Sequence, residues 1–92
     1  MNKYGLNKEE TKKEIEYAIG KINYYTNKIY DKKLKLEVKR QELLKSLDNS
    51  EATEEEIIDL IGDITRLTLK IEEFKKDIKR YYDYMKELEE DM

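Results

Sequence analysis

Apolar residues recur at helical spacing in two long stretches of the chain, and a short polar segment separates the stretches. In the second stretch, from about residue 54 to residue 91, the apolar side chains alternate between steps of three and four residues. This 3,4 repeat is sustained over about five heptads and predicts a coiled-coil seam. The seam positions are Ile57, Leu60, Ile64, Leu67, Ile71, Phe74, Ile78, Tyr81, Met85, Leu88 and Met92.

The first stretch, from about residue 8 to residue 47, shows the same repeat at only half of its seam positions. Every seventh residue is apolar, but the alternate positions in the middle are basic, at Lys32 or Lys33 and at Lys39 or Arg40. The pattern therefore predicts a second long helix with a weaker seam. The apolar positions are Ile15, Ile22, Ile29, Leu36 and Leu43.

The polar segment at residues 48–53, with the sequence DNSEAT, is the predicted turn. Asp, Asn and Ser favour turns because their side chains compete for backbone hydrogen bonds. Thr53 and Glu56 have the spacing of a capping box, which predicts that the second helix begins at about residue 54. Asn7 and Glu10 give a weaker version of this signal at the start of the first helix.

Folding the chain back at residues 51 and 52 tests whether the two seams match. Two layers in the middle do not, because Lys32 faces Ile71 and Lys39 faces Ile64. Either these isoleucines need cover from another molecule, or the lysines lay their methylene groups over them and keep the charges in water. Five apolar layers do match: Ile15 with Leu88, Ile22 with Tyr81, Ile29 with Phe74, Leu36 with Leu67 and Leu43 with Leu60.

These patterns predict an all-α fold, an antiparallel two-helix coiled-coil hairpin that forms one domain over residues 1–92. We expect helix 8–47, turn 48–53 and helix 54–91. An isolated glycine such as Gly20 costs a helix only about 1 kcal/mol, so both helices should be continuous. Two helices bury one stripe each, and we therefore expect the hairpin to dimerise into a four-helix bundle or to dock on a partner.

The charge distribution is uneven along the chain. The net charge is −3, but residues 1–47 hold 12 basic and 7 acidic side chains, whereas residues 48–92 hold 7 and 15. Opposite charge on the two halves favours pairing between them, within one chain or between two chains. The high Lys, Ile, Asn and Tyr content also suggests coding by a low-GC bacterium or its phage.

Composition excludes most catalytic classes. The chain has no Cys and no His, which removes thiolate and imidazole chemistry, disulfides and typical zinc sites. Carboxylate pairs such as Asp59 with Asp63 are expected by chance among 22 acidic residues. We expect no enzyme activity, no cofactor and no metal. No secretory signal or apolar run of about 20 residues is present, so a cytoplasmic location without membrane contact is expected.

Exposed apolar and aromatic residues are the candidates for binding a protein partner. Leu34 and Val38 lie one turn apart on the far side of the first helix, although two ordinary exposed aliphatic residues would give the same pattern. Tyrosines gather near the open end of the hairpin, and tyrosine is favoured in binding hot spots. The candidate set is Tyr17, Tyr24, Leu34, Val38, Ile64, Ile71, Tyr82 and Tyr84.

A basic segment of the first helix supports an alternative. Lysines interleaved with Tyr24, Tyr25 and Tyr30 can bind nucleic acid, because the cations contact phosphates and the rings stack on unpaired bases. The residues for this alternative are Lys28, Lys32, Lys33, Lys35, Lys39 and Arg40.

The sequence as a whole favours a non-enzymatic protein–protein interaction module, of the kind that phages and mobile elements encode as small regulators or inhibitors. We expect it to form a homodimer. The alternative is a nucleic-acid-binding hairpin dimer that uses the basic Tyr/Lys face of the first helix.

Overall fold

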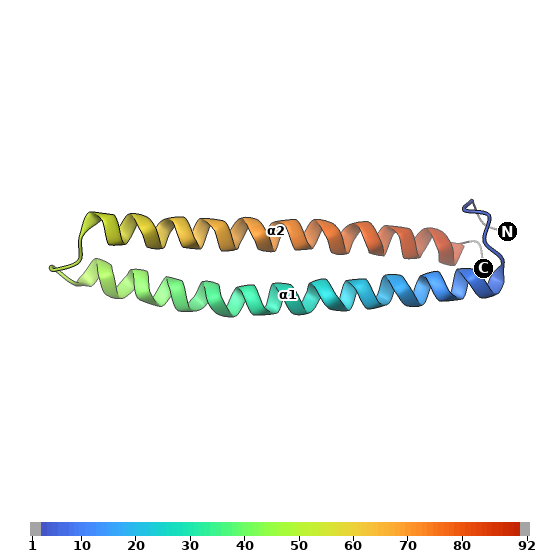
Figure 1. Ribbon diagram of the computed structural model, residues 1–92, viewed down its shortest axis with the longest axis horizontal. Coiled ribbons are helices and arrows are strands. Elements are labelled where there is room, and N and C mark those ends of the chain that lie inside the picture. Colours follow the sequence, from blue (N-terminus) through green and yellow to red (C-terminus); the bar gives the residue numbers. More distant parts are fainter. Residues whose placement is uncertain (1–2, 91–92) are drawn as a thin grey trace.

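The chain forms two long antiparallel helices joined by a short turn (Figure 1), as seen in a computed structural model that describes residues 3–90. Helix α1 spans Lys8–Asp48 and helix α2 spans Glu54–Glu90. The hairpin measures 66 × 16 × 13 Å. The predicted all-α hairpin is confirmed, and α1 ends one residue later than expected. The predicted end of the second helix at residue 91 and the seam position Met92 lie outside the described residues.

The start of α1 is fixed by a complete capping box. The Asn7 side chain accepts a hydrogen bond from the Glu10 amide at 2.8 Å, and the Glu10 carboxylate accepts one from the Asn7 amide at 3.2 Å. At α2 the Glu56 amide donates to the Thr53 hydroxyl at 3.2 Å, and the helix begins at Glu54 as predicted. The capping box at Asn7, which looks weaker in the sequence than the one at Thr53, therefore gives the more complete cap.

Asn49 organises the turn between the helices. Its backbone N–H donates to the Ser46 carbonyl at 3.2 Å, and its side-chain oxygen accepts from the Glu51 amide at 3.0 Å. Its own carbonyl accepts from the Ala52 amide at 3.1 Å. The first bond satisfies a carbonyl that the end of α1 leaves free, and the other two satisfy amides within the turn, which is why an Asn-containing segment stops the helix here.

Helix α1 runs without a break through Gly20, so the expected continuity is confirmed. Apart from the two chain neighbours and the surrounding turns of the helix backbone, a methyl group added at Gly20 would meet no atom within 4 Å. Over residues 3–90, neither helix has a stretch long and apolar enough to cross a membrane.

The core is a single thin layer between the helices. Among the described hydrophobic residues four are buried, namely Ala18, Leu36, Ile71 and Leu88. The other described seam side chains, including Phe74, are half-buried. A two-helix molecule of this shape has no second layer to cover them, since each helix packs on one neighbour only.

Ile71 is buried within the hairpin although the predicted register gives it no apolar mate. It is only 5% exposed, although the residue expected opposite it is Lys32. Lys32 and Lys39 are themselves half-buried, and the Lys39 ammonium reaches carboxylates at the surface. Their methylene groups can cover apolar neighbours while the charges stay in water. Ile71 therefore offers little surface to a second molecule, and Ile64 is likewise half-buried within the hairpin. A role of these two residues in partner binding stays a prediction.

Contacts between the helices agree with the predicted register. The Tyr25 ring centroid lies 5.8 Å from that of Phe74 and 6.1 Å from that of Tyr81. In the predicted register Tyr25 lies one seam position after Ile22, which faces Tyr81, and one before Ile29, which faces Phe74, so these contacts are the expected ones. Near the turn, the Lys39 Nζ lies 3.5 Å from an Asp63 oxygen, one residue before the expected Ile64.

Candidate functional site

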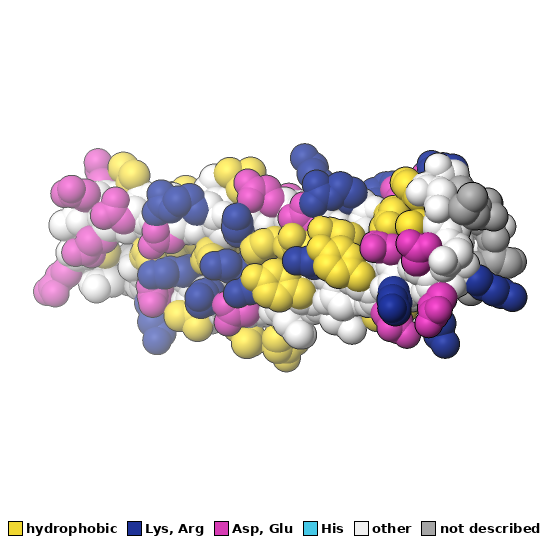
Figure 2. Space-filling view, turned by 45° about the vertical axis from the view of Figure 1, so that its right-hand side comes forward, with side chains coloured by type: hydrophobic (Ala, Val, Ile, Leu, Met, Phe, Trp, Pro, Cys, Tyr) yellow, Lys and Arg dark blue, Asp and Glu magenta, His cyan; other side chains and the backbone are white. Residues whose placement is uncertain are grey.

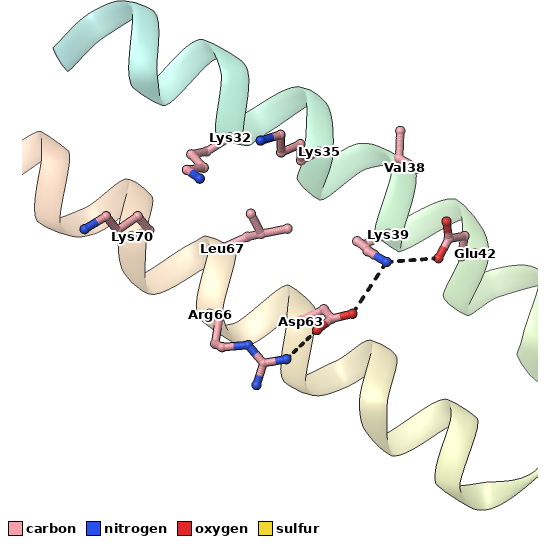
Figure 3. A pocket seen from close by; sticks show the side chains of 9 residues that line it. All are labelled: Lys32, Lys35, Val38, Lys39, Glu42, Asp63, Arg66, Leu67 and Lys70. Atoms are coloured by element: carbon pink, nitrogen blue, oxygen red, sulfur yellow. Dashed lines mark hydrogen bonds and ion pairs between the residues drawn. The ribbon is translucent and has the colours of Figure 1, made fainter. Parts of the chain in front are cut away.

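A basic cleft lies between the helices on one side of the hairpin (Figure 3), with a volume of about 630 Å³. Side chains from both helices line it, with Val38 and Leu67 as its apolar residues. Five basic and two acidic side chains complete the lining, so the cleft carries an excess of positive charge. The charged residues are Lys32, Lys35, Lys39, Arg66, Lys70, Glu42 and Asp63.

Asp63 is the centre of the ion pairs in the basic cleft. Arg66, one turn further along α2, binds one Asp63 oxygen, and Lys39 reaches from α1 to the other at 3.5 Å. Lys39 also lies 3.5 Å from Glu42. The hydrogen bond from Arg66, followed by the charge of Lys39, lowers the pKa of the Asp63 carboxyl below its ordinary value of 3.8.

The remaining cations of the cleft differ in how they are paired. Lys35 lies 3.4 Å from Asp31, and Lys70 lies 3.2 Å from Glu73, in both cases along a single helix. Within residues 3–90, no carboxylate lies within 4.0 Å of the Lys32 ammonium. Figure 3 shows the Lys32 side chain extending from α1 toward the space between the helices, whereas the Lys70 side chain runs along α2. Lys32 is thus the cleft cation most available to an anionic group.

A cluster of aromatic rings joins the two helices between the basic cleft and the open end of the hairpin. Tyr25 packs on Phe74 and Tyr81 of α2, and the Tyr17 ring centroid lies 6.2 Å from that of Tyr81. Tyr24 meets Tyr25 edge to face, with 5.2 Å between centroids. Tyr25 thus supports one side of the Tyr24 ring, which is 52% exposed.

Lysines alternate with the exposed tyrosines along α1. The Lys21 Nζ lies 5.7 Å from the centroid of Tyr17 and 5.8 Å from that of Tyr24, and the Lys28 Nζ lies 5.3 Å from that of Tyr24. We call these four residues the Tyr–Lys ladder. Figure 2 shows hydrophobic side chains, rings among them, over the middle of one face, with Lys and Arg between and beside them. Such rings are held by cation–π attraction at little cost in side-chain freedom.

Tyr84 belongs to an internal contact at the open end. It is half-buried, and its hydroxyl donates to Glu14 at 3.1 Å. Burial, followed by this hydrogen bond, raises the pKa of Tyr84. The Tyr4 ring packs edge-on against Tyr84 at 5.1 Å, and the Tyr4 hydroxyl donates to Glu87. Tyr84 therefore helps to close the hairpin.

The predicted partner-binding residues do not form one surface. Tyr17 and Val38 line hollows on the cleft side, and Tyr24 lies between them on the Tyr–Lys ladder. Leu34 is 57% exposed but does not line the basic cleft. Tyr82 is exposed and contacts Lys86 on the outer surface of α2.

The basic residues proposed for nucleic acid are also divided. Lys32, Lys35 and Lys39 line the basic cleft, with Lys28 next to them on the ladder, whereas Lys33 and Arg40 do not line it. Sequence reasoning missed the contribution of α2, which is made by Arg66 and Lys70. The predicted register already indicated this contribution of α2, since it places residues near position 70 beside Lys32.

The lowered pKa of Asp63 leads to a prediction about acid stability. A group whose pKa is lowered on folding stabilises the fold above its ordinary pKa, and this contribution is lost as the pH falls through the lowered value. Asp63→Asn should therefore lower the thermal midpoint at pH 7 and have little effect well below pH 3.8. Thermal unfolding followed by circular dichroism measures both. An equal loss at both pH values would show that the charge of Asp63 is not what stabilises the fold.

Within residues 3–90, no three His, Cys, Asp or Glu side chains are grouped to hold a metal ion. Comparisons with protein-family models, with curated proteins and with solved structures find no match to this chain. Its function must therefore be argued from the basic cleft and the Tyr–Lys ladder.

Proposed function

We propose that this chain is a protein-binding module, and that the basic cleft together with the Tyr–Lys ladder binds an acidic amphipathic segment of another protein. The observation that carries the proposal is the continuous arrangement of exposed, pre-positioned tyrosines, apolar floor and basic side chains along one side of the hairpin. Binding would occupy the partner's surface, as a small regulator or inhibitor does.

The aromatic half of this surface supports a protein partner. Tyr17 and Tyr24 are each 52% exposed, so they offer ring area to a partner while one part of each ring is held by the hairpin. Tyrosines in this state lose little entropy on binding, which is why they are common in hot spots. An apolar side chain of the partner would pack on these rings and on Val38.

The charged half of the surface specifies the sign of the partner's charge. Among the described residues no carboxylate lies within 4.0 Å of the Lys32 ammonium, and Lys35 and Lys70 are paired only with exposed neighbours on their own helices. Exposed pairs of this kind contribute about 0–1 kcal/mol, so an acidic side chain of the partner can replace them at little cost. Carboxylates one helical turn apart would match the spacing of Lys28, Lys32 and Lys35.

A selection from a library of displayed helical peptides tests this proposal. We expect the enriched peptides to combine Asp or Glu with an apolar stripe, and to lose at least about tenfold in affinity for the variant Lys32→Glu with Lys35→Glu. The control is Lys13→Glu with Lys76→Glu, which makes the same change in net charge at exposed positions outside the cleft. Enriched peptides that are not acidic, or that bind both variants equally, would contradict the proposal.

Nucleic acid remains the second candidate, and Lys28 and Lys32 favour it because no carboxylate in residues 3–90 pairs with them. Two features count against it. Asp63 and Glu42 stand within the cleft and would repel phosphates, and lysines already sit over the ring faces of Tyr17 and Tyr24. Steeply salt-dependent binding of a labelled single-stranded oligodeoxythymidylate, lost in the Lys32→Glu, Lys35→Glu variant, would select this candidate instead.

A further inference from the structure

Large apolar side chains also remain exposed on the side of the hairpin opposite the basic cleft. Six of them are 44–65% exposed and do not line the basic cleft. At 3.6 residues per turn they lie about 150° around their helices from the cleft-lining positions. We call this set the aliphatic face: Ile19, Leu44, Leu47, Ile58, Ile61 and Tyr82.

The aliphatic face has an apolar patch at each end of the hairpin. Leu44 and Leu47 of α1 lie near Ile58 and Ile61 of α2 at the turn end, because residues 44 and 58 are at the same level in the observed register. Ile19 and Tyr82 are at one level near the open end. Between the patches the same side carries polar residues such as Lys33 and Thr68, all exposed.

We propose that a second copy of this chain covers the aliphatic face and forms a four-helix bundle with both turns at the same end. The two-fold axis then runs along the hairpin, so α1 of each copy packs on α2 of the other. Leu44 and Leu47 of one copy meet Ile58 and Ile61 of the second copy, and Ile19 meets Tyr82 of the second copy. Every apolar patch therefore lies on an apolar patch.

Charge complementarity favours this occupant and this orientation. Helix α1 holds 11 basic and 8 acidic side chains, whereas α2 holds 7 and 12, so each helix meets one of opposite net charge. Along the same side, Glu16 is level with Lys86 of the second copy, and Tyr30 is level with Glu72 of the second copy. A two-fold axis across the hairpin would instead place α1 on α1 and α2 on α2, which joins helices of like charge.

The area available is close to what a stable dimer needs. Six large side chains that are each about half exposed offer roughly 600 Å² per copy, compared with about 800 Å² per partner in a standard interface. The polar residues between the patches supply the remainder. The basic cleft faces outward in this dimer, so the inference does not rest on the proposed function and either can fail without the other.

Sedimentation equilibrium of matched variants tests the interface. We expect the wild-type chain to be dimeric at micromolar concentration, and Leu44→Glu with Ile58→Glu to dimerise at least tenfold more weakly. The control is Leu34→Glu with Leu69→Glu, because these residues are exposed to the same extent, 57% and 59%, but lie off the aliphatic face. This control should dimerise like the wild type. A monomeric wild type, or an equal effect of the two double variants, would overturn the proposal.

A disulfide experiment tests the orientation and does not depend on the glutamate variants folding. One chain carries Leu44→Cys and the other Ile58→Cys, and the two are mixed under mild oxidation. The proposed axis predicts the mixed disulfide between the two chains in preference to either symmetric one. If Leu44→Cys instead crosslinks to a chain with Ile19→Cys, the copies are related by the axis across the hairpin, and the proposed bundle is wrong.

Discussion

Replacing Leu36 by alanine is expected to lower the free energy of unfolding by about 2–5 kcal/mol. Leu36 is 7% exposed and lies in the middle of α1, where the core is one layer thick. Neighbouring side chains have no second layer behind them that could move in to fill the space. Chemical denaturation measures the change, and it should be done at one protein concentration because dimerisation would add to the apparent stability.

Leu34→Ala is the matched control for this experiment. Leu34 is two residues away on the same helix and is 57% exposed, so its loss should change the free energy of unfolding by less than about 0.5 kcal/mol. The difference in the free energy of unfolding between the two variants gives the effect of burial without that of helix propensity, because both replace leucine by alanine in α1. Equal effects would show that the face of α1 that packs on α2 has been assigned wrongly.

Phe74→Ala should cost about 3 kcal/mol, as expected for the loss of a packed aromatic side chain. The Phe74 ring packs against Tyr25 of α1, and the Lys70 ammonium lies 5.1 Å from its centroid. Its removal also leaves Tyr25 without one of its two partners on α2. Tyr24, whose ring rests on Tyr25, should then become more mobile.

Phe74→Leu separates the volume of this side chain from its aromatic character. The leucine keeps most of the apolar contact and should recover more than half of the stability lost in Phe74→Ala. The near-ultraviolet circular dichroism of the tyrosines should stay reduced in both variants, because the ring contact is missing in both. A thermal midpoint for Phe74→Ala within error of the wild type would show that Phe74 does not pack between the helices.

The heptad pattern predicted the fold because hydrophobic spacing encodes which face of each helix packs. The turn followed from residues 48–53, and the start of α2 at Glu54 followed from its cap. Ile71 shows where this reasoning stops. A pattern of apolar and polar letters treats Lys32 as a mismatch, but the methylene groups of lysine are apolar and can cover an isoleucine.

The candidate site was predictable only in part, because it is built from two helices. Lys32, Lys35 and Lys39 were found as a run on α1, whereas Arg66 and Lys70 are isolated within an acidic helix and join them only after folding. The ion pairs could not be predicted from the charged residues of the sequence either, since Asp63 binds two of the basic side chains. The aliphatic face could not be predicted from either helix alone for the same reason, since Leu44 and Ile61 form a patch only beside Ile58 and Leu47.

The hairpin is 66 Å long, and the beginning of α1 and the end of α2 lie at the same end of it. A force that pulls the two chain ends apart would therefore act on one layer at a time, starting at the layer of Leu88 and moving toward the turn. The chain should open gradually like a zipper at low force, and it should not break in a single event. Under tension the contacts of Tyr84 with Glu14 and Tyr4 would be lost first, and the Asn49 turn would be the last part to open.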